Sequence, residues 1–183
     1  GDGDDTTPGG DGDDTTPGGN GDDTTDGGAG GDGIQDPPDG TPDPSIAFNP
    51  VEGDADANTL TGTDGPDFVN GREGDDTAVT GQGTDVLNGN QGDDELSAGP
   101  GEDSLFGGFG GDLLLPGIDN DLADGGRGDD TLLSDRGFDT LSGNRGDDEI
   151  SGGNGDDVLF GDAGNDILRG QVGNDFIDGG EGD

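Results

Sequence analysis

One acidic residue recurs at a fixed interval through most of the chain, and its spacing suits the binding of metal ions. Reading from Gly53 in steps of nine, the sixth position holds Asn58 in the first unit and aspartate in the 13 units that follow. Those residues are Asp67, Asp76, Asp85, Asp94, Asp103, Asp112, Asp121, Asp130, Asp139, Asp148, Asp157, Asp166 and Asp175. Carboxylate and carbonyl oxygens are the ligands of hard divalent cations, and calcium accepts an irregular oxygen set more readily than magnesium does. The period therefore predicts calcium sites along this column of residues.

A column of aspartates has one alternative interpretation, a polar ladder that shapes the loops without metal. Like charges one strand apart repel one another unless something lies between them, which favours the metal. A second acid often precedes the sixth-position aspartate, as in Asp75 and Asp93. We interpret this fifth-position acid as a solvated loop charge rather than a ligand.

The overall charge favours cations as partners and excludes several other classes. Aspartate and glutamate number 46 against 5 arginines, with a formal net charge of -41, so the basic face that nucleic acid requires is missing. No apolar run approaches membrane-spanning length, so this segment should not insert into a membrane. The sequence contains no His and no Cys, which removes the usual zinc ligands, general base and thiol nucleophile. We expect no enzymatic activity.

The nonapeptide also predicts the elements that position the aspartates. The consensus is Gly-Gly-x-Gly-x-Asp-x-U-x, where U is a large aliphatic residue, and glycine allows the positive φ angles of a tight loop. The last three residues favour a strand of about three residues, which must stack on copies of itself. Two units would close a coil of 18 residues, which predicts an all-β, parallel β-roll with the eighth position inside. These inward residues are Leu60, Val69, Ala78, Leu87, Leu96, Leu105, Leu114, Ala123, Leu132, Leu141, Ile150, Leu159, Leu168 and Ile177.

The segments before Gly53 differ in composition from the main array. Residues 1–27 form a degenerate acidic nonapeptide array with threonine in place of the aliphatic residue, which is typical of a disordered low-complexity tether. Residues 28–52 are proline-rich and favour an extended linker. Within it, residues 46–51 contain Ile46, Ala47, Phe48 and Val51, which could cover the first apolar layer as an N-terminal cap; chance apolar residues in a linker are the alternative.

The consensus resembles the calcium-binding nonapeptide of the RTX (repeats-in-toxin), hemolysin-type family over residues 53–183. The resemblance implies a right-handed parallel β-roll in which calcium lies between loops on successive coils. One loop would offer its second and fourth carbonyls and its aspartate, and the loop 18 residues on its first and third carbonyls and its aspartate. On one edge this implies five complete pairs among the loops 71–76, 89–94, 107–112, 125–130, 143–148 and 161–166. The final loop, 179–183, ends before its sixth position.

The ligands implied on this edge are backbone or side-chain oxygens of residues spread over six loops. They are Gly71, Glu73, Asp76, Gly89, Gln91, Gly92, Asp94, Gly107, Gly110, Asp112, Gly125, Gly126, Arg127, Gly128, Asp130, Gly143, Arg145, Gly146, Asp148, Gly161, Gly164 and Asp166. The opposite edge departs from the consensus at Pro116, Asp119, Ser134 and Asp135. The ligands implied there are Asp67, Asp85, Asp103, Asp139, Gly152, Gly153, Gly155, Asp157 and Asp175.

The resemblance implies a calcium-binding module that folds when calcium is plentiful, as part of a larger protein. It also implies a bacterial extracellular protein exported by a type I system. Two alternatives stay open: an accessory domain that assists secretion of an RTX enzyme or toxin, and a segment of a repetitive surface adhesin. We expect a truncated fifteenth unit at the C-terminus, calcium ions as the partners, and a protein or surface partner that the sequence does not identify.

Overall fold

The computed structural model describes residues 48–182, and within that range all regular structure is β-strand. The predicted tether of residues 1–27 and the linker residues 28–47 lie outside the described residues. Fifteen strands follow one another along the chain. They are β1 (Asn49–Glu52), β2 (Thr59–Thr61), β3 (Asp67–Glu73), β4 (Thr77–Val79), β5 (Val86–Gln91), β6 (Glu95–Pro100), β7 (Ser104–Phe109), β8 (Leu113–Ile118), β9 (Leu122–Arg127), β10 (Thr131–Leu133), β11 (Thr140–Arg145), β12 (Glu149–Asn154), β13 (Val158–Phe160), β14 (Ile167–Val172) and β15 (Phe176–Asp178).

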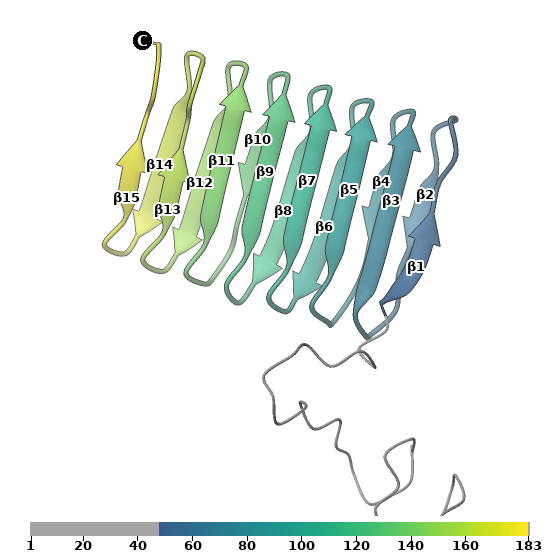
Figure 1. Cartoon of the computed structure of the whole chain (residues 1–183). Coiled ribbons are helices and arrows are strands. Elements are labelled where there is room, and N and C mark those ends of the chain that lie inside the picture. Colours follow the sequence, from purple (N-terminus) through teal and green to yellow (C-terminus); the bar gives the residue numbers. More distant parts are fainter. Residues whose placement is uncertain (1–47, 183) are drawn as a thin grey trace, which may run out of the picture. The chain divides into compact units, whose positions relative to one another are not determined.

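The strands form two parallel sheets that face each other across the roll (Figure 1). Odd-numbered strands make an eight-stranded sheet in sequence order, and even-numbered strands from β2 to β14 make a seven-stranded sheet. Each residue pairs with the residue 18 positions on, as Val69 does with Leu87 and Leu87 with Leu105. The predicted parallel β-roll with two nonapeptides per coil is therefore confirmed.

Many strands are longer than the three residues that the sequence predicts. Strand β5 runs for six residues because the parallel ladder continues through the glycine positions, where Asn90 pairs with Gly108. The longer strands carry the pairing register up to the loops. Equivalent loops on successive coils are therefore held in line.

Eighth-position side chains form the interior from Leu60 to Leu159, as predicted, since each is at most 7% exposed and most are fully buried. The prediction was wrong at the C-terminal end of the roll. Leu168 is only partly buried, and Ile177 is 48% exposed because β15 is the last strand of its sheet. Ala98, which lies at the first position of its unit, joins this cluster at 1% exposure. The core lies between the two sheets and consists of aliphatic side chains, about one from each nonapeptide.

The roll begins before the first nonapeptide. Strand β1 pairs with β3, and Val51 lies opposite Val69 and packs against the core. Phe48 is 40% exposed. Ile46 and Ala47, the other residues of the predicted cap, lie outside the described residues.

Leu132 and Leu133 are adjacent on β10 but face opposite sides of the sheet, with exposures of 0% and 40%. Leu132→Ala should lower the unfolding free energy of the folded array by about 2–5 kcal/mol, because it leaves a cavity in a core that has few other contacts. Leu133→Ala, the matched control, should change it by about 0.5 kcal/mol or less. Denaturant unfolding in excess calcium measures both, and equal losses would contradict the observed side-chain orientation.

Candidate metal centre

The sixth-position aspartates lie beneath their loops, out of contact with water. Eleven of them, from Asp67 to Asp157, are between 0% and 4% exposed. Charged side chains are rarely buried this completely unless they are paired or bind a metal. The loops therefore form two rows of buried carboxylates, one at each edge of the roll.

The row that follows the odd-numbered strands, at the upper edge in Figure 1, comprises the loops that begin with Gly71, Gly89, Gly107, Gly125, Gly143 and Gly161. We call it the glycine row. The opposite edge is the mixed row, because its loops begin with different residues. Those first residues are Gly62, Thr80, Ala98, Pro116, Ser134, Gly152 and Gly170.

One oxygen of each aspartate ties neighbouring coils together. Asp112 Oδ1 accepts the backbone N–H of Asp94 at 2.8 Å, and Asp130 Oδ1 accepts that of Asp112 at 2.8 Å. The same bond recurs with a separation of 18 residues along both rows, from Asn58 N–H to Asp76 at one end to Asp157 N–H to Asp175 at the other. Each carboxylate is therefore fixed against the coil before it.

The other oxygen is buried without a hydrogen-bond partner in ten of the aspartates. A buried carboxylate oxygen left unpaired is costly, and ten in register are not an isolated defect. This is the feature of the described residues that best fits a cation. The ten are the Oδ2 atoms of Asp76, Asp85, Asp94, Asp103, Asp112, Asp121, Asp130, Asp148, Asp157 and Asp166.

Backbone carbonyl oxygens lie close to first-position glycines of the glycine row, as the aspartate Oδ2 atoms do. A carbon built at the Cβ position of Gly71 would lie 2.3 Å from Asp76 Oδ2 and 2.9 Å from the carbonyl oxygen of Gly89 on the next coil. Gly107 has an equivalent place, 2.3 Å from Asp112 Oδ2 and 2.6 Å from the Gly125 carbonyl oxygen. The Cβ position is thus crowded by oxygens of two successive loops at Gly71, Gly89, Gly107 and Gly161.

Positive φ angles help turn the loop backbone toward its neighbour. The fourth-position glycines adopt them, with φ of 134° at Gly110 and 128° at Gly128. Second-position residues also adopt them, including Asn90 at 79° and Asn144 at 70°, where the consensus has glycine. Asparagine tolerates this conformation better than most residues with a side chain.

The donor set suits calcium, since calcium takes six to eight oxygens at about 2.3–2.6 Å. Within residues 48–182, no three acidic side chains converge on one point. A cation between two coils would therefore take aspartate oxygens and complete its shell with backbone carbonyls. In the glycine row, aspartate Oδ2 atoms and first-position carbonyls of successive loops lie close together, as at Gly71 and Gly107. The predicted third-position carbonyl of Arg127 instead accepts the backbone N–H of Gly110 at 2.8 Å. The full ligand set stays a prediction, and the aspartates of the mixed row lie at the opposite edge.

Two aspartates of the mixed row have partners for both oxygens. Asp67 Oδ2 accepts the backbone N–H of Thr63 at 2.7 Å. Asp139 Oδ2 accepts the hydroxyl of Ser134 at 2.5 Å. A cation would therefore stabilise these two carboxylates less than those whose Oδ2 has no hydrogen-bond partner.

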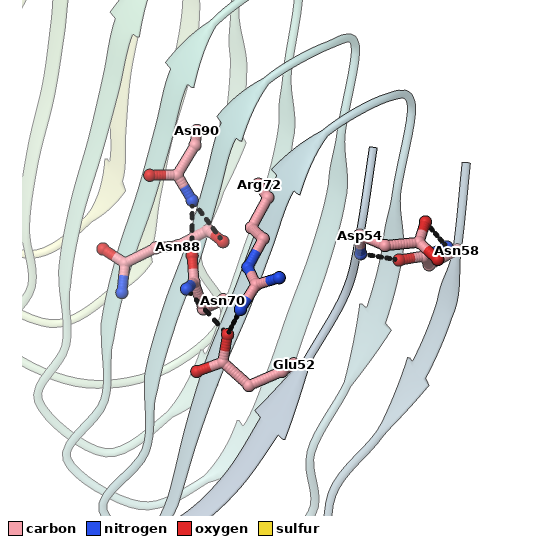
Figure 2. A network of polar contacts seen from close by, with 7 residues as sticks. All are labelled: Glu52, Asp54, Asn58, Asn70, Arg72, Asn88 and Asn90. Carbon is pink, nitrogen blue, oxygen red and sulfur yellow. Dashed lines mark hydrogen bonds and ion pairs between the residues drawn. The ribbon is translucent and has the colours of Figure 1, made fainter. Parts of the chain in front are cut away.

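The first unit satisfies its own loop, as Figure 2 shows at the N-terminal end of the roll. Asn58 Oδ1 accepts the N–H of Asp54 at 2.7 Å, and Asn58 Nδ2 donates to Asp54 Oδ1 at 3.2 Å. On the neighbouring sheet Glu52 pairs with Arg72 at 2.8 Å (Figure 2). The sixth position of this unit therefore holds an amide that is hydrogen-bonded within its own loop, where the later units hold a carboxylate.

The fifth-position acids form a second ladder that sequence reasoning missed. Asp93 Oδ1 accepts the N–H of Gly111 at 2.8 Å, and Asp129 Oδ1 accepts the N–H of Asp147 at 2.9 Å. These side chains are exposed and bond to the following coil, whereas the buried aspartates bond to the preceding one. The recurrence of Asp or Asn at the fifth position was the available signal.

The buried carboxyl groups resist ionisation when no metal is bound. Burial raises the pKa of Asp94, Asp103, Asp112 and Asp148 to about 6, and that of Asp121 and Asp130 to about 7. Hydrogen bonds from the preceding coil oppose the shift, and the charges of neighbouring aspartates add to it. A bound cation would remove this disadvantage of the ionised form.

Comparison with known proteins agrees with this geometry. A family model described as the RTX calcium-binding nonapeptide repeat (4 copies) matches residues 52–87, 79–114, 117–141, 124–159, 133–168 and 151–183. Together the matches cover all of residues 52–183 except 115 and 116. No curated protein matches the chain.

Without calcium, acidification should stabilise the folded array. The folded state holds protons up to about pH 6–7, whereas unfolded aspartates release them near their ordinary pKa of 3.8, so stability rises as the pH falls through that window. Far-UV circular dichroism in chelator should show strand signal growing between pH 7.5 and pH 5. A strand signal that stays constant or decreases on acidification would contradict the raised pKa values of the buried aspartates.

Proposed function

Because the chain belongs to the RTX calcium-binding nonapeptide repeat family, we propose that it is a calcium-binding β-roll module whose folding is coupled to the metal. The column of unpartnered Oδ2 atoms is the observation that carries this proposal. In the calcium-free chain these atoms must lose water and lie near like charges about one strand spacing apart. In the calcium-bound chain each finds a cation, so calcium favours the folded state over the unfolded one.

The small core supports the same conclusion. The apolar cluster of the described roll has thirteen buried aliphatic side chains, with Val51 and Leu168 partly buried against it. Each ordered residue costs backbone entropy, and a core of this size offsets little of it. The net charge adds repulsion within the compact state. Neutralisation of the buried carboxylates by bound calcium would supply stabilisation that this core does not.

The glycine row is where we place the principal calcium sites. Each ion would lie between two successive loops, with aspartate oxygens such as those of Asp112 and Asp130 and first-position carbonyls such as that of Gly125. Calcium supplies positive charge and a flexible shell that joins the two loops. The protein residues bury the ligands, fix the carboxylates by their Oδ1 bonds and exclude water from the apolar side.

We place the module outside a bacterial cell, as part of a larger protein exported by a type I system. Calcium sites of extracellular modules bind at about 10⁻⁴–10⁻³ M, which keeps such a chain unfolded where calcium is scarce. The family membership and the acidic composition support this location. No helix within residues 48–182 is long and apolar enough to span a membrane. We assign no enzymatic activity to the module, since the sequence lacks His and Cys and its carboxylates serve as ligands.

Calcium titration of the chain should convert an unfolded spectrum into a strand spectrum. Far-UV circular dichroism at pH 7.5 measures the change, and we expect a cooperative transition because each ion joins two coils. Magnesium at the same concentration should give little signal, since it requires a tighter octahedron and releases water reluctantly. Full strand signal in chelator would refute coupled folding, and an equal response to magnesium would refute the selectivity.

A further inference from the structure

A shallow depression of about 520 Å³ lies on the outer face of the odd-numbered sheet, where β7, β9 and β11 are neighbours (Figure 1). Its walls come from four successive coils, and no sixth-position aspartate contributes to them. The aromatic and polar side chains that line it are Phe109, Asp124, Arg127, Asn144, Arg145 and Asp162. This surface is therefore separate from the carboxylates assigned to calcium.

Two arginines of the depression lie side by side. Arg127 on β9 is the register partner of Arg145 on β11, so these exposed side chains project from strands about 4.8 Å apart. Like charges in this arrangement repel each other. Within residues 48–182, the arginines that form ion pairs are Arg72 and Arg169. The guanidinium groups of Arg127 and Arg145 therefore keep their N–H donors for another molecule.

Two carboxylates face the same depression, and neutral groups hold them in place. Asp124 Oδ1 accepts a hydrogen bond from Asn144 Nδ2 at 2.7 Å, and Asp162 Oδ2 accepts one from the hydroxyl of Ser142 at 2.7 Å. The second oxygen of each carboxylate accepts no hydrogen bond from residues 48–182, so it remains an acceptor. With two arginines and two aspartates, the formal charges of the depression cancel.

Phe109 adds an apolar surface to these polar groups. Its ring is 55% exposed, although it lies on the outer face of a sheet whose other side is buried. The guanidinium carbon of Arg127 lies 5.0 Å from the ring centroid, which is within the range of a cation–π contact. The contact fixes the orientation of the arginine before any ligand arrives, and this lowers the entropic cost of binding.

The mixture of charges selects the class of ligand. An anion would lie beside Asp124 and Asp162 and be repelled by a chain of net charge -41. A cation would lie beside Arg127 and Arg145. Hydroxyl groups carry no charge and both donate and accept hydrogen bonds, so they match both kinds of side chain. Four coils span three strand spacings, about 14 Å, which suits several linked sugar rings better than one.

We propose that this depression binds a neutral glycan. The two arginines donate hydrogen bonds to sugar hydroxyls, the two aspartates accept hydrogen bonds from them, and Phe109 packs against the C–H groups of a ring. The inference goes beyond calcium binding, since it gives the folded roll a second ligand. It uses side chains on the outer face and leaves the backbone carbonyls of the loops to the metal.

A glycan array probed with the calcium-saturated chain tests for this ligand. The array carries linear oligosaccharides of glucose, mannose, galactose and N-acetylglucosamine, with uronate and sulfated oligosaccharides of the same lengths. At least one neutral series should bind, with an affinity by isothermal titration calorimetry that rises with chain length and changes little with salt. Absence of binding by every neutral series at millimolar concentration would overturn the proposal. Binding of acidic oligosaccharides alone would overturn it too.

Two arginines one nonapeptide apart provide a matched test of the site. Arg145 lines the depression, whereas Arg136 is an equally exposed third-position residue of the mixed row and does not. Arg145→Gln should weaken binding of the best oligosaccharide from the array about tenfold, because a charged donor is lost. Arg136→Gln removes the same charge and should leave the affinity unchanged. Equal effects in the two variants would refute the location of the site.

Two asparagines allow a test that preserves the loop backbone. Asn144 and Asn90 have φ angles of 70° and 79° at the second position, where the consensus has glycine. Glycine adopts these angles readily, so neither replacement strains the loop. Asn144→Gly removes the amide that holds Asp124 and should lower glycan affinity roughly 2- to 10-fold. Asn90→Gly, outside the depression, should not change it, and an unaltered affinity in Asn144→Gly would count against the proposal.

Calcium counts on the same variants separate the glycan site from the metal sites. Native mass spectrometry should find as many calcium ions in Arg145→Gln and Asn144→Gly as in the wild type, because no sixth-position aspartate has changed. Far-UV circular dichroism at saturating calcium shows that the variants are folded. If both variants lost glycan and calcium together, the surface would not be a separate site and the inference would fail.

Discussion

Repulsion between buried carboxylates is the constraint on which this structure depends. Each coil adds two aspartates to the interior of a chain that already carries a formal charge of -41. One oxygen of each is satisfied by the backbone of the neighbouring coil, and the other faces no donor in ten cases. In these ten aspartates, protein contacts therefore satisfy only one of the two carboxylate oxygens. The apolar core is small, so the free-energy cost of leaving these oxygens unpaired weighs heavily against the stabilisation that the core provides.

The fold and the metal sites share one period. Strand pairing and the Oδ1 hydrogen bonds both connect residues 18 positions apart. An insertion of a single residue would shift the inward side chains outward and move the aspartate out of line with its neighbours. The absence of any insertion or deletion from Gly53 to the end of the array follows from this double requirement. Loop length is fixed by the site as much as by the sheet.

The period was sufficient to predict the coil, the inward residues from Leu60 to Leu159 and the stacking of the aspartates, but not the exposure of Ile177 at the end of the sheet. Strand length was underestimated, because pairing across glycines such as Gly108 depends on neighbours that one unit does not reveal. The second ladder through Asp93 and Asp129 was missed, since an exposed acid beside a buried one looks like a solvated charge. Strand β1 lies outside the repeat and carries no periodic signal. The sequence departure at Ser134 was visible, but only the geometry shows that its hydroxyl donates to Asp139 Oδ2.

The two rows differ in chemistry although the same strands carry them. At Ala98 the methyl group at the first position is 1% exposed and joins the apolar cluster. At Ser134 the hydroxyl donates to Asp139 Oδ2, so that oxygen is satisfied without a cation. Asp85, Asp103 and Asp121 in the same row nevertheless keep an Oδ2 atom without a hydrogen-bond partner. A different first residue therefore changes how a loop packs without satisfying the buried carboxylate beneath it.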